Sequence, residues 1–174
     1  MTVSVHGALL EVHGVGTALL GPSGVGKSEC ALELLSRGHR LVADDVIELT
    51  PEPDDGLKGR APERIRHYME IRGIGIVFVP DLFGADSVCD EVSVDLVCRL
   101  ERWREGAAYE RVGLERPKEE FAGVRLPRLT LPARPGGSMA TVVELAARDH
   151  LQRRSGVNAA KRLDQRLRDE MERR

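Results

Sequence analysis

The chain has 174 residues, of which 41% are hydrophobic and 31% charged, and its formal net charge is −2. These values are typical of one globular domain, and the near-balanced charge argues against a nucleic-acid binder that works through bulk positive charge. No apolar run approaches the length of a membrane span, and the N-terminus lacks a charged and then apolar secretion signal.

The three cysteines, Cys30, Cys89 and Cys98, are odd in number and form no C-x-x-C pair. A disulfide framework or a zinc site has a different cysteine pattern. We therefore expect reduced thiols and a cytoplasmic protein. Because only 3% of the residues are aromatic, we also expect a core built mainly from aliphatic side chains.

The first 50 residues predict strands interrupted by one helix. Apolar residues over 3–12 predict a strand, 13–16 a turn, and 17–20 a short buried strand. Helical spacing runs from 28 to 37 and stops at Gly38. Residues 40–43 then predict a strand that ends at Asp44 and Asp45, followed by another strand over 46–49.

The rest of the chain predicts a long loop, more strands and two final helices. Residues 50–62 hold three prolines and several acids, which indicates a solvated loop, and 64–70 favour a short helix or a turn. The later strands and helices are expected over 74–79, 92–96, 124–131, 139–151 and the segment capped by Asn158. This order predicts an α/β fold with a mostly parallel or mixed central sheet and flanking helices, in a single domain spanning 1–174.

Residues 21–28 form a complete G-x-x-x-x-G-K-[ST] phosphate-binding loop between a predicted strand and a predicted helix. Its glycines allow tight turns that bring backbone N–H groups to phosphate oxygens, and a helix N-terminus attracts anions. Lys27 can reach the β- and γ-phosphates of a nucleoside triphosphate, and the Ser28 hydroxyl can coordinate Mg²⁺. The predicted nucleotide-binding residues are Gly21, Pro22, Ser23, Gly24, Val25, Gly26, Lys27 and Ser28.

Acidic residues that follow the loop provide candidates for metal binding and catalysis. Asp44 and Asp45 end the strand after the loop helix, at the edge of a parallel sheet where ligands bind. One of them can hold Mg²⁺, and the other can accept the proton of a hydroxyl nucleophile. Glu70 is a candidate second metal ligand because hard oxygens suit Mg²⁺. The alternatives are a pair of acids that cap a turn and, for Glu70 with Arg72, a surface ion pair.

Together with the segments that follow, these residues resemble the HPr kinase/phosphorylase catalytic domain. The most specific match is Glu-Ile-Arg-Gly-Ile-Gly-Ile at 70–76, and Arg-Gly-His-Arg-Leu-Val-Ala-Asp-Asp at 37–45 is another. Further matching segments are the phosphate-binding loop, His6-Gly7, Ala61-Pro62, Leu82-Phe83-Gly84 and Val143-Glu144-Leu145-Ala146-Ala147. The resemblance covers nearly the whole chain, without the separate N-terminal domain of many members, so we expect a single catalytic domain.

The resemblance implies an ATP- and Mg²⁺-dependent kinase that phosphorylates a serine of the small phosphocarrier protein HPr and so regulates sugar phosphotransferase activity and carbon metabolism. It implies that Lys27 binds the β- and γ-phosphates, that Ser28 and Glu70 coordinate Mg²⁺, and that Asp45 takes the serine proton. It also places His6 and Arg111 in the active site. From the residues alone, neither His6 nor Arg111 differs from an ordinary surface residue.

The resemblance further implies a fold similar to the nucleotide domain of phosphoenolpyruvate carboxykinase and assembly into hexamers. Many members reverse the reaction with inorganic phosphate and release pyrophosphate. Gly137 and Ser138 stand where members commonly have an arginine and its neighbour, and Phe78 stands where the family usually has a polar residue. These departures count against the reverse reaction, because a guanidinium that grips phosphate is missing.

Two other functions remain open at the level of the sequence. The altered segment 134–138 is compatible with a nucleotide- or phosphate-sensing module that has lost catalysis. The phosphate-binding loop and the acid pair also fit a kinase of a small hydroxyl metabolite such as free serine, because these residues do not select the hydroxyl that is phosphorylated.

Overall fold

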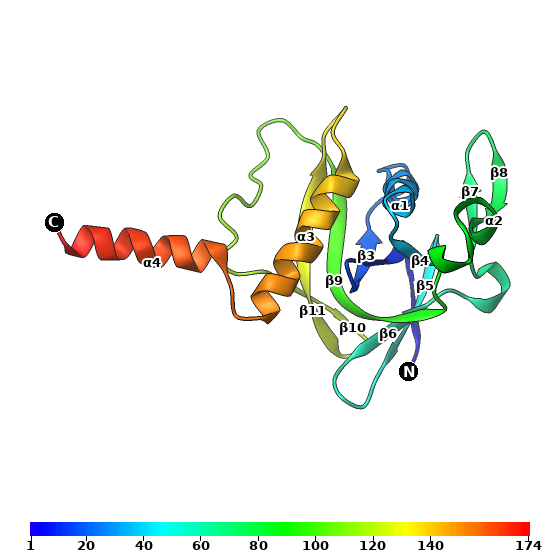
Figure 1. Ribbon diagram of the computed structural model, residues 1–174, viewed down its shortest axis with the longest axis horizontal. Coiled ribbons are helices and arrows are strands. Elements are labelled where there is room, and N and C mark those ends of the chain that lie inside the picture. The colour runs from blue at the N-terminus through cyan, green and yellow to red at the C-terminus, as the bar shows by residue number, and fades with distance from the viewer.

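A twelve-residue strand, β9 (Glu91–Arg102), runs through the centre of a nine-stranded mixed sheet in the computed structural model, which describes residues 1–174 (Figure 1). The other strands of this sheet are β1 (Val3–His6), β2 (Ala8–Val12), β3 (Val15–Leu20), β4 (Arg40–Ala43), β5 (Val46–Pro51), β6 (Leu57–Arg60), β10 (Lys118–Phe121) and β11 (Val124–Ala133). The remaining strands form the hairpin β7 (Tyr68–Ile71) and β8 (Gly75–Phe78), and the α-helices are α1 (Lys27–Ser36), α2 (Val79–Phe83), α3 (Met139–Arg154) and α4 (Ala159–Glu172). Two short 3₁₀ helices span Glu63–Ile65 and Ala85–Ser87.

The sheet has the strand order β1-β5-β6-β9-β3-β2-β4, and β11 pairs with both β9 and β10. Only the β3–β9 and β9–β11 pairings are parallel, and all the others are antiparallel. The prediction of a mixed α/β sheet is therefore confirmed, and its mostly parallel form is wrong. Part of the reason is local: short connections join β2 to β3, β5 to β6 and β10 to β11, and strands joined in this way are antiparallel neighbours. The antiparallel pairings β1–β5, β2–β4 and β6–β9 join strands that no such turn connects.

Two bent strand pairs bring the two edges of the sheet together. β1 continues into β2 through Gly7, and β4 continues into β5 through Asp44 and Asp45. β1 pairs with β5 and β2 pairs with β4, so the two continuous segments form one antiparallel ribbon with a bend. At the bend, the Gly7 N–H donates to the Asp45 carbonyl oxygen (3.0 Å). Residues 3–12, predicted as one strand, therefore form two.

The bend requires glycine at position 7 for a steric reason. A Cβ atom there would lie 2.5 Å from the Leu19 carbonyl oxygen, which belongs to the backbone and cannot move aside easily. The same packing places Gly7 directly against the strand that leads into the phosphate-binding loop.

Alternate residues of the strands enter two buried clusters on opposite faces of the sheet. Ala8, Leu10 and Val12 pack with the buried faces of α1 and α3, whereas Leu9 packs in the second cluster with residues of β5 and β6. All six residues of β3 are buried, as expected for a strand covered on both faces. Both clusters are almost entirely aliphatic, as the composition predicted.

Two further expectations meet different outcomes. Residues 50–62 are not only a loop, because they contain β6, whose Leu57 is fully buried and which pairs with β9. The final helix is confirmed as α4, and the Asn158 side chain accepts a hydrogen bond from the Lys161 N–H (3.1 Å) as its cap. This helix has no buried residue and extends away from the rest of the molecule (Figure 1).

No helix in the structure combines the length and the apolarity that crossing a membrane requires.

Candidate active site

The phosphate-binding loop connects β3 to α1, and its backbone packs tightly against the neighbouring strand β9. A Cβ atom at Gly21 would lie 2.4 Å from the Leu100 carbonyl oxygen. Gly26, directly before α1, has φ +107°, a conformation that side-chain-bearing residues rarely adopt. The glycines of the loop are therefore needed for the path of the chain, and α1 begins at Lys27 with its N-terminus at the loop.

Lys27 folds its side chain back over the loop. Its Nζ donates to the carbonyl oxygens of Gly21 (2.6 Å) and Pro22 (3.0 Å). The ammonium group thus lies at the mouth of the loop, beside backbone N–H groups that can bind an anion. A bound polyphosphate would compete with the two carbonyl oxygens for this ammonium group.

Ser28 and Asp44 contact each other beneath the loop. The Ser28 hydroxyl donates to Asp44 Oδ1 (3.3 Å), and Asp44 is only 9% exposed. Burial raises the pKa of Asp44 from 3.8 to about 6, and the neighbouring Asp45 also raises it, whereas the Ser28 hydrogen bond and Lys27 lower it. A cation bound here would favour the charged carboxylate.

Asp45 sits at the centre of a tight three-residue turn in the bent ribbon. The Val46 N–H donates to the Asp44 carbonyl oxygen (2.9 Å) across this turn, and Asp45 has φ +70°. Such conformations are costly for a residue with a side chain, by about 1–3 kcal/mol, and they occur often at functional sites. The turn exposes the carboxylate and places its Oδ1 3.8 Å from His6 Nδ1 on the paired segment.

Glu70 reaches the same region from the β7–β8 hairpin, which forms a separate two-stranded sheet. It lines a cavity of about 470 Å³ together with parts of the loop, of α1 and of the bend. The cavity-lining residues include Gly7, Ser23, Gly24, Gly26, Lys27, Ser28, Asp44, Asp45, Glu70 and Arg72. A loop suited to anions thus faces three carboxylates that come from two other segments.

The structure does not bring every predicted site residue to this cavity. Arg111 lies exposed in the segment between β9 and β10 and does not line it. Val25 lines a second cavity instead. His6, Gly21 and Pro22 do not line the first cavity either. Gly7 and Arg72 line the first cavity but were not predicted as site residues. Arg72 is a basic residue only two positions after the predicted metal ligand Glu70, and this closeness in the sequence was the signal that could have identified it.

A histidine cluster lies away from this site, where the β2–β3 turn meets α3 and the segment after α1. His39 Nε2 lies 3.1 Å from Glu144 Oε1, and His13 Nε2 lies 4.0 Å from Glu144 Oε2, so the three side chains have a spacing that is compatible with a metal ion. However, two of these candidate ligand atoms already interact with guanidinium groups. Arg148 Nε donates to His13 Nε2 (3.2 Å), and Arg37 Nη1 lies 3.4 Å from Glu144 Oε1. Burial, His39 and Arg148 lower the pKa of His13. The cluster therefore acts as a network of hydrogen bonds and ion pairs that holds the three segments together.

The sheet, the glycine loop and the facing carboxylates define a mixed α/β domain built to hold an anionic ligand beside acidic groups. The family model described as HPr Serine kinase C-terminal domain matches residues 1–167, and the chain belongs to this family. The resemblance noted in the sequence is thereby confirmed.

Curated relatives agree with this assignment. The chain is 52% identical over 165 residues to an HPr kinase/phosphorylase of Caldanaerobacter subterraneus subsp. tengcongensis, which covers 95% of this chain and 54% of that protein. It is 50% identical over 171 residues to an HPr kinase/phosphorylase of Geobacillus thermodenitrificans, covering 98% and 55% of the two chains. The chain thus spans about half the length of the curated relatives it matches.

A solved structure has the same fold. The HPr(Ser) kinase/phosphatase from Coxiella burnetii superimposes with a TM-score of 0.81 at 33% sequence identity. The superposition covers 88% of this chain and 93% of that one. The arrangement of strands and helices described above is therefore that of a known member of this group.

Proposed function

We propose that this chain is the catalytic part of a kinase that transfers the γ-phosphoryl group of ATP to a serine of a small HPr-like phosphocarrier protein. The observation that carries the proposal is the single cavity in which Lys27, Ser28, Asp44, Asp45 and Glu70 meet. The names of the relatives, HPr kinase/phosphorylase and HPr(Ser) kinase/phosphatase, support the choice of substrate.

The loop and its helix are the proposed binding site for the triphosphate. Backbone N–H groups of Ser23, Gly24 and Gly26 and the N-terminus of α1 would hold the phosphate oxygens. Lys27 would leave the carbonyl oxygens of Gly21 and Pro22 and bind the β- and γ-phosphates. The required movement is a change of side-chain rotamer, since the ammonium group already lies at the mouth of the loop.

The residues around Asp44 fit Mg²⁺. Ser28 Oγ and Asp44 Oδ1 lie 3.3 Å apart, and the carboxyl is buried with a raised pKa, so a cation would relieve the unfavourable burial of its charge. Glu70 lines the same cavity and offers further hard oxygen atoms. Bound Mg²⁺ would neutralise charge on the β- and γ-phosphate oxygens during transfer.

Asp45 is the proposed base. In the forward reaction the serine oxygen forms a bond to the γ-phosphorus, the bond from this phosphorus to the β–γ bridging oxygen breaks, and ADP leaves. The hydroxyl proton passes to the Asp45 carboxylate. The exposure of Asp45 and its position in the bend suit an acceptor that belongs to another protein. His6, 3.8 Å from Asp45, would orient the carboxylate.

The reverse reaction is not part of this proposal, although the names of several relatives include phosphorylase. Ser138, at the altered position, caps α3 by accepting from the Thr141 N–H (3.3 Å), and it donates to Glu33 Oε1 (2.9 Å). Neither Ser138 nor Gly137 offers a guanidinium group for inorganic phosphate. Arg111 would reach the cavity only if the segment between β9 and β10 moved.

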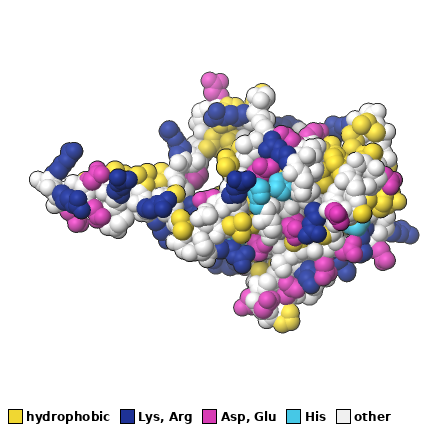
Figure 2. Space-filling view, in the orientation of Figure 1, with side chains coloured by type: hydrophobic (Ala, Val, Ile, Leu, Met, Phe, Trp, Pro, Cys, Tyr) yellow, Lys and Arg dark blue, Asp and Glu magenta, His cyan; other side chains and the backbone are white.

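The proposal also includes oligomers, a cytoplasmic location and a likeness to the nucleotide domain of phosphoenolpyruvate carboxykinase, with no nucleic-acid or membrane partner. An apolar row on α4, formed by Leu163, Leu167 and Met171, is exposed and supports assembly with further copies, as in the hexamers of the family. Hydrophobic side chains are visible along this projecting helix in Figure 2. The three free cysteines support a reducing compartment.

The test is transfer of labelled phosphate from Mg·[γ-³²P]ATP to purified HPr, with mass spectrometry to locate the phosphoserine. Asp45→Asn should lower the transfer rate by roughly 10²–10⁴-fold. Asparagine tolerates the left-handed backbone conformation of this position, so the turn should persist. The matched control is Asp55→Asn, because Asp55 also has positive φ (+62°) but lies outside the cavity.

Two outcomes would contradict the proposal in different ways. Wild type that binds ATP but labels no serine of HPr would contradict the substrate. An Asp45→Asn variant that transfers phosphate at the wild-type rate would contradict the assignment of Asp45 as the base. Free serine and other small alcohols, assayed in parallel by ADP release, measure the competing activity on metabolites.

A further inference from the structure

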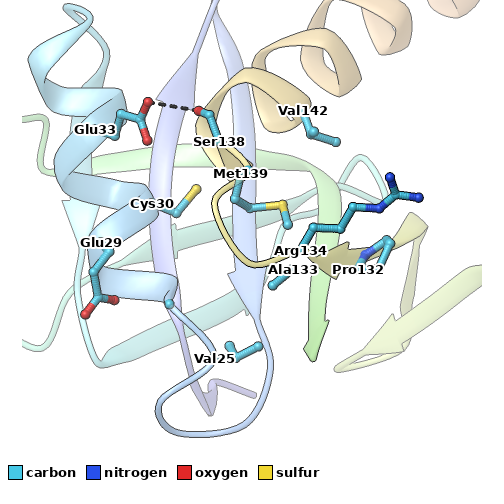
Figure 3. A pocket seen from close by; sticks show the side chains of 12 residues that line it. Val25, Glu29, Cys30, Glu33, Pro132, Ala133, Arg134, Ser138, Met139 and Val142 are labelled. Carbon is cyan, nitrogen blue, oxygen red and sulfur yellow. Dashed lines mark hydrogen bonds between the residues drawn. The ribbon is translucent and has the colours of Figure 1, made fainter. Parts of the chain in front are cut away.

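The β7–β8 hairpin carries Glu70 to the cavity although it is not part of the main sheet. Its two strands pair only with each other, and Figure 1 shows the hairpin and α2 at the side of the molecule. Glu70, Ile71 and Arg72 line the first cavity. No hairpin residue lines the second cavity, on the other side of the first turns of α1 (Figure 3). The position of Glu70 therefore depends on how the hairpin is attached to the rest of the fold.

Two apolar side chains hold the hairpin against the rest of the fold. Met69 lies in the first strand and Val79 directly follows the second, and both are almost completely buried in the cluster that includes the buried face of α1. Apolar burial is non-directional, so it holds the hairpin in place without fixing the direction in which Glu70 points. That direction requires contacts with a defined geometry.

The chain enters the hairpin through a left-handed residue, His67. Its φ is +69°, a conformation that is uncommon for residues with a side chain but enriched for histidine. Its carbonyl oxygen accepts from the Val79 N–H (2.9 Å), directly beyond the last pair of the ladder, Tyr68 with Phe78. This bond closes the open end of the hairpin, shortly before Glu70 in the sequence.

The His67 side chain faces the residue at which the chain leaves this region. Its Nε2 lies 3.4 Å from Asp90 Oδ1, and Asp90 directly precedes β9. Arg66 Nη1 lies 4.0 Å from the same oxygen, and no other carboxylate lies within ion-pair distance of either residue. His67 Nε2 and Arg66 Nε are buried without a hydrogen-bond partner, so the Asp90 carboxylate is the acidic group that compensates for their burial.

A further contact fixes the exit of this region relative to the bend of the main sheet. The Cys89 N–H donates to the Leu41 carbonyl oxygen (3.0 Å), and Leu41 forms an isolated parallel bridge with Val88. Leu41 belongs to β4, the strand that leads into the bend. Asp90 is thus held close to the strand of the acid pair, and His67 connects Asp90 to β7.

We propose that His67, paired with Asp90, is a positioning residue that sets the direction of the β7–β8 hairpin and so places the Glu70 carboxylate at the cavity. His67 does not line the cavity, so it acts through Glu70. The inference rests on the proposed function, because the role of Glu70 as a Mg²⁺ ligand is part of that proposal. It adds that the metal site depends on a contact outside the cavity.

The test uses Asp90→Asn and His67→Asn in the full chain. The Asp90 side chain is 69% exposed and asparagine keeps its shape, so the first variant removes the charge with little effect on packing. Asparagine also tolerates a left-handed backbone, so the second variant keeps the turn and removes the imidazole. Each variant should raise the Mg²⁺ concentration for half-maximal phosphate transfer roughly tenfold, and the rate at saturating Mg²⁺ should change by less than about twofold.

Two further readouts separate positioning from a general loss of structure. Amide hydrogen exchange should become faster over 68–78 in both variants and stay unchanged in α1 and β3. Titration of the ATP complex with Mn²⁺, followed by electron paramagnetic resonance, should show weaker binding in Asp90→Asn but no further loss when this change is added to Glu70→Gln. Asp86→Asn is the matched control, because Asp86 is an exposed acid of the same region that takes no part in these ion pairs and does not line the cavity.

An unchanged Mg²⁺ requirement in both variants, or an equal further loss of Mn²⁺ binding in the Glu70→Gln background, would overturn the assignment of His67. Unchanged hydrogen exchange over 68–78 would overturn it as well, and this measurement needs no activity. Wild type that transfers no phosphate contradicts the proposed function instead, and the exchange experiment then decides by itself whether His67 orients the hairpin.

Discussion

Replacing Asp44 by asparagine should stabilise the metal-free protein at neutral pH. Asparagine has nearly the same shape, and its carbonyl oxygen can still accept the hydrogen bond from Ser28, so the change removes mainly the buried charge. Burial raises the pKa of Asp44 from 3.8 to about 6 in the folded protein. At about 1.4 kcal/mol per pKa unit, this difference corresponds to about 3 kcal/mol.

The direction of the pH dependence follows from proton binding. Between pH 4 and pH 6 the folded state holds the Asp44 proton more tightly than the unfolded state does. The free energy of unfolding therefore falls as the pH rises through this window, and the full loss is present above the folded pKa. Lys27 and the Ser28 hydrogen bond oppose the rise of this pKa, and Asp45 adds to it.

Urea unfolding from pH 4 to pH 8 in the presence of a chelator measures the effect. Carboxyls such as Glu119, whose pKa the hydrogen bond from Arg99 lowers, change stability in the opposite direction. These groups are present in both proteins and cancel in the difference between Asp44→Asn and wild type. That difference should be near zero at pH 4 and reach about 3 kcal/mol above pH 7. A difference that does not change with pH would refute the burial argument.

The remaining predictions concern glycine geometry and helix caps. Gly16→Ala should destabilise the protein by more than about 3 kcal/mol in urea unfolding, because its Cβ would lie 1.8 Å from the Ser93 carbonyl oxygen. Gly14→Ala should cost only about 1 kcal/mol, since its φ is +78° but no atom lies within 4 Å. Ser138→Ala should lower global stability by about 1 kcal/mol, because Ser138 caps the packed helix α3. Asn158→Ala should reduce only the helicity of α4 seen by circular dichroism, since that helix has no buried residue; equal global losses for the two cap variants would contradict this difference.

The phosphate-binding loop and its flanking elements could be predicted because the residues that determine their structure lie close together in the sequence. The motif at 21–28 fixes the turn chemistry, and the helical spacing after it needs no distant partner. The Asn158 cap is confirmed for the same reason. The short strand 17–20 is confirmed as part of β3, although the observed strand begins earlier, at Val15.

The pairing of β6 with β9 and the position of Glu70 depend on distant parts of the chain. β6 lies in a segment rich in prolines and acids, and it becomes a strand through pairing with β5 and β9. Glu70 reaches the cavity only because β7 and β8 form a separate hairpin beside it. Neither pairing leaves a periodic pattern in the sequence. The sequence therefore predicted Glu70 as a site residue but did not predict the hairpin that places it at the cavity.

The bend at Gly7, Asp44 and Asp45 gives two adjacent carboxylates different environments. In a regular strand, neighbouring side chains point to opposite faces of the sheet, so only one of the two could face the loop. The turn centred on Asp45, with φ +70°, removes this alternation. Asp44 stays buried against Ser28 while Asp45 is exposed near His6, and both line the same cavity. A buried acid that favours a cation beside an exposed acid that can take a proton matches the two roles proposed above, Mg²⁺ binding by Asp44 and proton acceptance by Asp45.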